Sequence, residues 1–166
     1  MESTGFCIFD ENMNPILIDS IQTKKSQSHG KRLKVIYDKL MELRDKYPPK
    51  VIVIERGFSR FNMATQVIYR VHGVTNLLFY DCDQIYYPPK TVKEAILSGN
   101  ATKKQVQEEI KKRYPDVVFK TDDESDAMAV GITYFIKNGK LEWIKDVVLK
   151  EKKVRVKKES KEKVKK

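Results

Sequence analysis

Val51-Ile52-Val53-Ile54-Glu55 decides the fold, because it is an uninterrupted β-branched run that ends on a carboxylate. Such a run is typical of a strand buried on both faces, as in a parallel sheet that has helices on either side. Glu55 would then stand at the carboxyl end of the strand, where open α/β sheets place their functional sites. The alternative is a surface glutamate that ends a strand or pairs with Arg56.

The residues before this strand predict a hairpin and then a helix. Two apolar runs, Thr4 to Asp10 and Ile16 to Ile21, are separated by a polar turn over 11–15, which indicates a β-hairpin. Apolar residues then recur at three- and four-residue spacing from Leu33 to Tyr47, as on one face of a helix.

The residues after the strand predict further α/β units. The predicted elements are a helix over 62–73, a buried strand from Thr75 to Cys82, a rigid loop from Tyr86 to Pro89, two short helices with capping boxes beginning at Thr91 and Thr102, and a helix over Asp122–Lys137. Antiparallel strands followed by β-α units point to a mixed sheet with helices on both sides.

Composition limits the classes of function. The chain of 166 residues suggests one domain over 1–149 and a basic, disordered tail over 150–166. The tail holds ten basic and three acidic residues, so it carries most of the net charge of +10 and favours a polyanionic partner such as nucleic acid. A solvated tail that only aids solubility is the alternative. No apolar run is long enough to span a membrane, and we expect a cytoplasmic protein.

A second acidic group lies at the start of the last predicted helix, Asp122-Asp123-Glu124-Ser125-Asp126. Acids in a first helical turn complement the positive helix terminus, but four acids in five residues repel one another unless a cation is present. Asp123 and Asp126 are three residues apart and so share a helix face. Together with Glu55 they would offer the all-oxygen ligands that Mg²⁺ or Mn²⁺ prefers.

These residues, taken in order, resemble the RuvC-like Holliday junction resolvases, whose fold is RNase H-like. The resemblance runs from about Ser3 to Ile136. It implies that Glu55, Asp123 and Asp126 are catalytic metal ligands and that Lys103 is also catalytic. It further implies that Phe58 stacks on bases at the junction and that Lys93 and Lys103 approach the scissile phosphate. Lys104 is expected to contact DNA too, although a solvated helix surface fits it better.

One element of the family has no counterpart in this sequence. The family begins with a strand that ends in an aspartate a few residues before the Thr-Gly pair, but only Met1-Glu2-Ser3 precede Thr4. The resemblance thus implies a missing first catalytic strand, either through a truncated start or through replacement of its acid by Glu2 or Asp10. For the sequence as given, we expect an incomplete metal site.

The leading expectation is therefore a homodimeric, Mg²⁺-dependent endonuclease that resolves four-way DNA junctions, with Met63, Val67 and Val71 at the candidate dimer interface. The basic tail suggests a bacteriophage-encoded member of the family. The alternative is a catalytically weak or inactive protein that binds branched DNA on the same scaffold. A third hypothesis keeps the nuclease chemistry but cuts a flap or an RNA–DNA hybrid.

Overall fold

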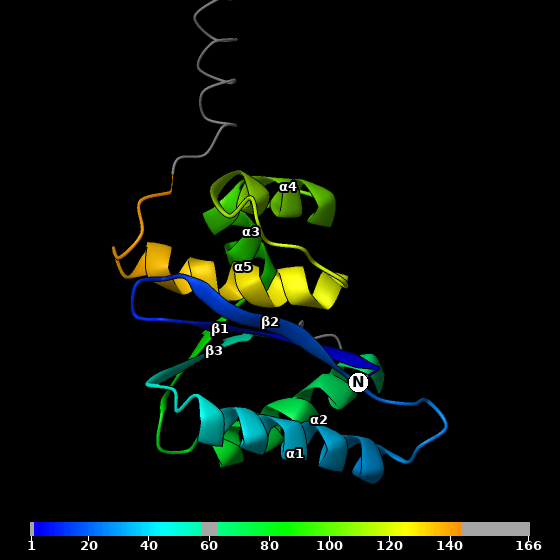
Figure 1. Ribbon diagram of the computed structural model, residues 1–166. Helices are drawn as coiled ribbons and strands as arrows, with labels where there is room; N and C mark the ends of the chain where they lie inside the picture. The colour runs from blue at the N-terminus through cyan, green and yellow to red at the C-terminus, as the bar shows by residue number, and fades with distance from the viewer. Residues whose placement is uncertain (1, 58–62, 144–166) are drawn as a thin grey trace, which may run out of the picture.

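The computed structural model describes residues 2–57 and 63–143, and Figure 1 shows strands between two groups of helices. Helices α1 and α2 lie on one side of the strands, and α3, α4 and α5 lie on the other. The elements in chain order are β1 (Ser3–Phe9), β2 (Pro15–Gln22), α1 (His29–Lys46), β3 (Val51–Glu55), α2 (Met63–Leu78), β4 (Asp83–Tyr87), α3 (Pro89–Ile96), α4 (Lys103–Arg113) and α5 (Asp122–Lys137). The predicted α/β architecture, with helices on both sides, is confirmed.

The predicted hairpin is formed by β1 and β2, which pair antiparallel from Ser3 opposite Gln22 to a bulge near the turn. In the turn, the carboxylate of Asp10 accepts hydrogen bonds from the backbone N–H groups of Asn12 at 2.9 Å and Asn14 at 2.8 Å. A short side chain that binds the backbone in this way stabilises a tight turn. Asp10 therefore has a structural role at this end of the hairpin.

The predicted strand from Thr75 to Cys82 is wrong, because α2 continues through Gly73 to Leu78. A short apolar run does not distinguish a strand from a buried helix, and here the helical hydrogen bonding continues, with the Thr75 hydroxyl donating to the Val71 carbonyl at 3.0 Å. The strand begins at Asp83 instead.

Strand β4 consequently includes part of the segment predicted as a rigid loop. It runs parallel to β3, with Val51 opposite Asp83 and Glu55 opposite Tyr87. The prolines that follow β4 start α3, since Pro88 is its N-cap and Pro89 its first residue. The helix thus begins two residues before Thr91, because proline is favoured in a first helical turn, where its missing N–H costs no hydrogen bond.

The strands form two separate two-stranded sheets, β1 with β2 and β3 with β4. Within the described residues, β3 therefore has a strand neighbour on one edge only. All five of its residues are half-buried, so the prediction of burial on both faces is wrong. A strand at the edge of a sheet leaves part of its surface and one row of backbone groups uncovered.

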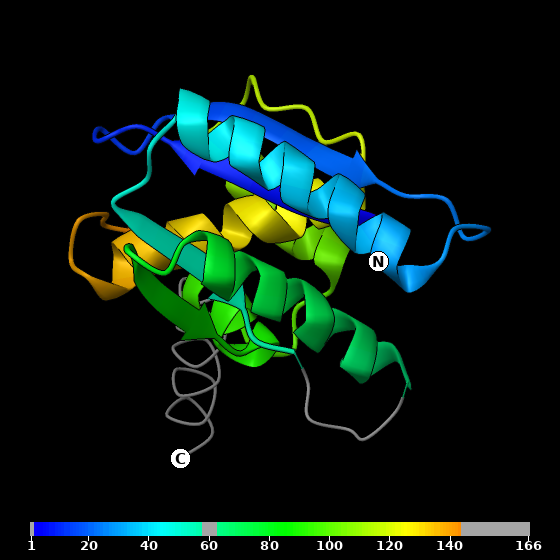
Figure 2. The same cartoon turned by 90° about the horizontal axis from the view of Figure 1, so that it is seen from below.

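Helix α5 packs against both sheets, because it contacts β1, β2 and β3, and Figure 2 shows it spanning the space between the hairpin and the parallel pair. Its bounds are those predicted. Two glycines allow the close approach of β1. A Cβ atom on Gly5 would lie 1.9 Å from the backbone oxygen of Asp123, and one on Gly131 would lie 2.4 Å from the ring of Phe9.

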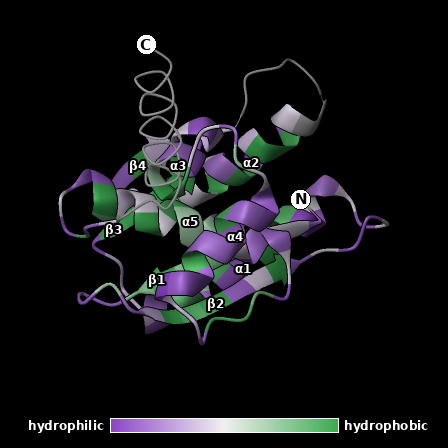
Figure 3. Ribbon diagram, turned by 90° about the horizontal axis from the view of Figure 1, so that it is seen from above, coloured by the Kyte–Doolittle hydropathy of each residue, from purple (hydrophilic) through white to green (hydrophobic). Residues whose placement is uncertain are grey.

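The hydrophobic core lies on the side of α5 that faces α3 and α4, and it includes Ile96, Ile110, Met128 and Ile132. Figure 3 shows α4 as a largely hydrophilic ribbon, which agrees with a helix that buries Val106 and Ile110 and exposes most of its lysines. In residues 2–57 and 63–143, no helix combines the length and apolar character that a membrane span requires.

Candidate functional site

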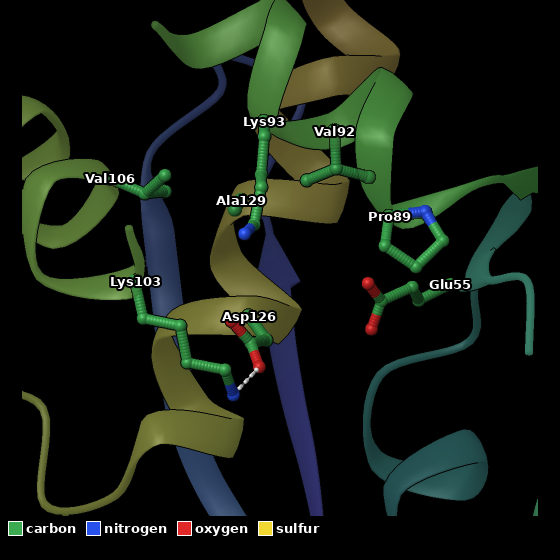
Figure 4. A pocket seen from close by; sticks show the side chains of 8 residues that line it. All are labelled: Glu55, Pro89, Val92, Lys93, Lys103, Val106, Asp126 and Ala129. Atoms are coloured by element: carbon green, nitrogen blue, oxygen red, sulfur yellow. Dashed lines mark hydrogen bonds and ion pairs between the residues drawn. The ribbon is translucent and has the colours of Figure 1, made fainter. Parts of the chain in front are cut away.

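A cavity of about 260 Å³ lies between the end of β3 and the first turns of α3, α4 and α5. Figure 4 shows two carboxylates on opposite sides of it and two lysines that reach into it. Its lining combines these charged side chains with apolar ones and consists of Glu55, Pro89, Val92, Lys93, Lys103, Val106, Asp126 and Ala129. Four of the predicted site residues therefore meet in one place, although they are far apart in the sequence.

Glu55 occupies one side of the cavity. The backbone of β3 is held at this point by its pairing with β4 and by a hydrogen bond from the Arg56 N–H to the Tyr87 carbonyl at 2.8 Å. Burial raises the pKa of Glu55, and the negative charge of Asp126 raises it further, while Lys103 and Lys93 oppose this rise. The ionised form of Glu55 is thus held at an energetic cost, which a bound cation would relieve.

Asp126 occupies the opposite side, one turn into α5. The start of α5 is fixed by a capping box in which the Thr121 hydroxyl accepts the Glu124 N–H and the Glu124 carboxylate accepts the Thr121 N–H. Glu124 is almost completely buried and also receives the hydroxyl of Ser20 in β2 at 3.2 Å. This places Asp122, Asp123 and Asp126 on outward-facing positions of a rigid helix end.

Sequence analysis missed the role of Glu124, which it counted only as one of the clustered acids. The signal was present, since Thr121 followed three residues later by Glu124 is the pattern of a capping box. His72 was missed as well. It lies in α2, and its ring contacts the rings of Tyr69 and Tyr86. Burial lowers the pKa of His72, and a hydrogen bond to the backbone of Glu55 opposes this effect.

Two lysines bring positive charge to the cavity. Lys103 is the first residue of α4, and its Nζ atom lies 2.5 Å from Oδ2 of Asp126. Burial acts to lower the pKa of Lys103, but the hydrogen bond and ion pair with Asp126 outweigh it and raise that pKa. Lys93 of α3 points into the cavity (Figure 4). Lys104 is exposed and does not line this cavity.

Asp123 does not line the cavity, although its charge acts on both Glu55 and Lys103. Within the part of the chain that the structure describes, no group of three or more acidic, histidine or cysteine side chains is arranged to hold a metal. The two acids that do face each other supply hard oxygen ligands of the kind that Mg²⁺ and Mn²⁺ prefer. The donor chemistry of Glu55 and Asp126 therefore fits a divalent ion.

The other candidate residues lie apart from the cavity or outside the described residues. Glu2 is exposed and pairs with Lys25 at 3.0 Å, and Asp10 holds the hairpin turn, so neither faces the cavity. Phe58 and the side chain of Met63 lie outside the described residues.

Comparisons with known proteins agree with this architecture. Residues 1–134 match the model of the family described as crossover junction endodeoxyribonuclease RuvC. A protein of that name from Pseudothermotoga lettingae is 34% identical over 120 residues, which are 67% of this chain and 72% of the relative. Another from Alkaliphilus metalliredigens is 35% identical over 124 residues, covering 69% and 73% of the two chains.

Two solved structures share the fold. The Thermus thermophilus RuvC structure has a TM-score of 0.64 at 15% identity and covers 75% of this chain and 76% of the other. The T. thermophilus RuvC in complex with Holliday junction substrate has a TM-score of 0.65 at 15% identity, with 76% and 82% covered. At this identity the likeness concerns the fold, and it confirms the predicted RNase H-like α/β class.

Proposed function

The chain belongs to the RuvC family of crossover junction endodeoxyribonucleases, and we propose that it resolves four-way DNA junctions by Mg²⁺-dependent hydrolysis of phosphodiester bonds. The observation that carries the proposal is the position of Glu55 and Asp126 on opposite sides of a cavity that also receives Lys93 and Lys103. Acids can hold the cation that such a hydrolysis uses, and lysines can contact the phosphate.

Glu55 and Asp126 are the proposed ligands of Mg²⁺, with Mn²⁺ as a substitute. Their mutual repulsion contributes to the raised pKa of Glu55, so a cation between them stabilises both ionised forms. Asp123, on the same helix end, is the proposed third ligand because its charge reaches Glu55. When bound, the ion supplies electrostatic stabilisation of the charge that develops on the phosphate during hydrolysis.

Lys93 and Lys103 are the proposed phosphate contacts. A lysine attracts phosphate as a point charge without reading base identity, which suits an enzyme that recognises the shape of a junction. The basic body and tail add to this attraction over a longer range. Phe58 is the proposed stacking residue, because an unpaired base presents a π-face whatever its identity.

A weakly catalytic protein that binds branched DNA is the second candidate. One observation favours it, namely that the described residues contain no set of three side chains placed to hold a metal. Two facing acids and two lysines would still bind DNA in the presence of a cation, but with an incomplete site they would cleave slowly.

We also propose that the active form is a homodimer, because symmetric cuts across a junction need two sites. Helix α2 supports this proposal: the predicted interface residues Val67 and Val71 are half-buried, and the neighbouring Ile68 and Tyr69 are 41% and 46% exposed. Exposed apolar residues clustered on one element are typical of an interface. A cytoplasmic location and an origin in a bacteriophage stay predictions.

The test compares Asp126→Asn with Asp122→Asn on a labelled four-way junction with and without Mg²⁺. Both changes remove one charge from the same helix end, but Asp122 accepts a hydrogen bond from Gln107 and does not line the cavity. We expect Asp126→Asn to lose at least about 1,000-fold in nicking rate while keeping junction binding, and Asp122→Asn to stay within about fivefold of wild type.

A wild-type protein that binds the junction but does not nick it would favour the second candidate. Nicking that persists in Asp126→Asn would contradict the proposed site. Parallel reactions on a flap and on an RNA–DNA hybrid then decide whether the four-way junction is the preferred substrate.

A further inference from the structure

The two lysines of the cavity are in different states. Lys103 is 2.5 Å from the Asp126 carboxylate, whereas Lys93 forms no ion pair with any residue of the described part of the chain. Figure 4 shows Lys93 reaching down from α3 to end near Ala129, above Asp126, and Lys103 bound at the side of Asp126 that lies away from Glu55. Because both ammonium groups reach the same small cavity, this difference calls for a physical cause.

The cause is the way in which α4 is attached to α5. Thr102 and Gln105 form a capping box that fixes the first turn of α4, and one turn further on Gln107 donates to both the Asp122 carboxylate at 3.1 Å and the Ser125 hydroxyl at 2.9 Å. Lys103 is therefore presented to Asp126 by a helix start that is already held in place, so that only its side chain has to become ordered on pairing.

We infer that Lys103 is the resting counter-ion of Asp126, that a divalent ion entering the site displaces it, and that the released ammonium then becomes available to the phosphate. The inference rests on the proposed function, because it concerns the same metal ligands. Lys103 already uses Oδ2 of Asp126 at 2.5 Å, and a divalent ion bound to the same carboxylate would repel the nearby ammonium, because like charges at short separation repel. Lys103 and the metal therefore compete for one carboxylate.

This competition couples metal binding to substrate binding. Without metal, Lys103 neutralises Asp126 and lessens the repulsion that acts on Glu55. With metal, the ammonium of Lys103 is released from Asp126 and adds to the positive charge of Lys93 in the same cavity. Lys93 is not paired with Asp126 and needs no such release. Lys93 can therefore contact the phosphate with or without metal, whereas Lys103 can do so only after metal has bound.

The test measures Mn²⁺ binding to the full chain without DNA, by electron paramagnetic resonance of free Mn²⁺, for wild type, Lys103→Met and Lys93→Met. Both variants remove one positive charge from the same cavity, so Lys93→Met controls for the general electrostatic effect. We expect Lys103→Met to bind Mn²⁺ about 3- to 10-fold more tightly than wild type, and Lys93→Met to change the affinity by less than about twofold.

Equal affinities in the two variants would overturn the inference, because Lys103 would then act only through the average positive field. Weaker binding by Lys103→Met would overturn it too, since Lys103 would then support the site. Lys103→Arg is a second variant that keeps the positive charge beside Asp126 and should bind Mn²⁺ no more tightly than wild type. Tightening in Lys103→Arg equal to that in Lys103→Met would contradict competition by charge.

Junction nicking, measured separately, distinguishes a failure of the inference from a failure of the proposed function. If wild type nicks junctions with Mg²⁺ and the affinities of Lys103→Met and Lys93→Met are equal, the function stands and the inference falls. If Mn²⁺ binding is the same in wild type and Asp126→Asn, the proposed metal site falls and the inference falls with it.

Discussion

Glu55 and Asp126 border the same cavity, but within residues 2–57 and 63–143 only Asp126 has a positively charged side chain in direct contact. Asp126 stands on a capped helix and is paired with Lys103, whereas Glu55 ends an edge strand, is partly buried and has a raised pKa. An ionised group that is buried without a direct partner is costly, and proteins retain such groups mainly where a ligand supplies the missing charge. The side of the cavity formed by Glu55 is therefore the side that lacks a positive charge.

Removal of the charge of Glu55 should have the largest effect. If Glu55 and Asp126 hold one ion from opposite sides, Glu55→Gln should reduce Mg²⁺-dependent nicking by at least about 1,000-fold, as much as Asp126→Asn. Steady-state nicking of a four-way junction measures this, with Glu94→Gln in the neighbouring helix α3 as the control. A residual rate in Glu55→Gln near that of wild type would show that the ion is held by α5 alone.

The second test disturbs the packing of β1 against the first turn of α5, the helix that carries Asp126. A methyl group on Gly5 would meet the backbone oxygen of Asp123 at 1.9 Å, so Gly5→Ala must push β1 away from α5. We expect a loss of about 3 kcal/mol in the free energy of unfolding, measured by urea denaturation.

Gly73→Ala is the matched control for that change, because a methyl group there meets nothing within 4 Å. Removing a glycine from the interior of α2 should stabilise the protein by about 0.5 to 1 kcal/mol. Similar effects of the two substitutions would contradict the close packing of the hairpin on α5.

The third test concerns the unpaired lysine. Lys93→Met should weaken junction binding and lower the slope of log affinity against log salt by about 0.9, as expected for the loss of one phosphate contact. Lys31→Met on α1, which lies on the far side of the strands from α3 in Figure 1, is the control and should leave the slope nearly unchanged. Fluorescence anisotropy at several salt concentrations measures the slope for each variant. Equal slopes for wild type and Lys93→Met would show that Lys93 does not contact a phosphate.

The smallest expected effect is a change in Tm, and its sign should differ between substitutions of the two acids. Glu55 has a pKa raised above its unfolded value, so its ionised form destabilises the folded protein at neutral pH, and the cost disappears as pH falls through that raised pKa. Glu55→Gln should therefore raise Tm by about 1 to 3 °C at pH 7.5 without metal.

Asp126→Asn should instead lower Tm by about 1 to 2 °C, because it loses the ion pair with Lys103. Thermal scans at pH 7.5 and at pH 4 measure both variants. The gain in Glu55→Gln should shrink at pH 4, where wild-type Glu55 is protonated. Shifts of the same sign at pH 7.5 would contradict the difference between the two sides of the cavity.

The elements that bear the acids could be predicted from local patterns. The β-branched run before Glu55 and the regular spacing of apolar residues in Asp122–Lys137 each determine a structure from neighbouring residues alone. The segment 75–87 could not be predicted in this way. Its apolar half continues a helix, and Asp83 and Gln84 give β4 a polar start that local patterns do not associate with a strand.

The charged residues that line the cavity were among those predicted from the sequence, whereas the ion pair and the apolar lining of the cavity were not. Lys103 and Asp126 are 23 residues apart, and their pairing depends on the contact of two helix starts, which no local pattern reports. The apolar lining by Val92, Val106 and Ala129 likewise belongs to helix faces that are typical of any core. Tertiary packing alone shows that Asp123, although adjacent in the motif, lies outside the cavity.

Cleavage of the protein itself by bound Fe²⁺ measures whether one divalent ion is held between Glu55 and Asp126. In the presence of ascorbate and peroxide, Fe²⁺ in the Mg²⁺ site generates radicals that cut the nearest backbone, and mass spectrometry locates the cuts. We expect cuts near residue 55 and near residue 126 in the same sample. Excess Mg²⁺ should suppress both cuts, and both should be lost in Asp126→Asn. Cuts at only one of the two positions, or at neither, would contradict a single ion held between the two acids.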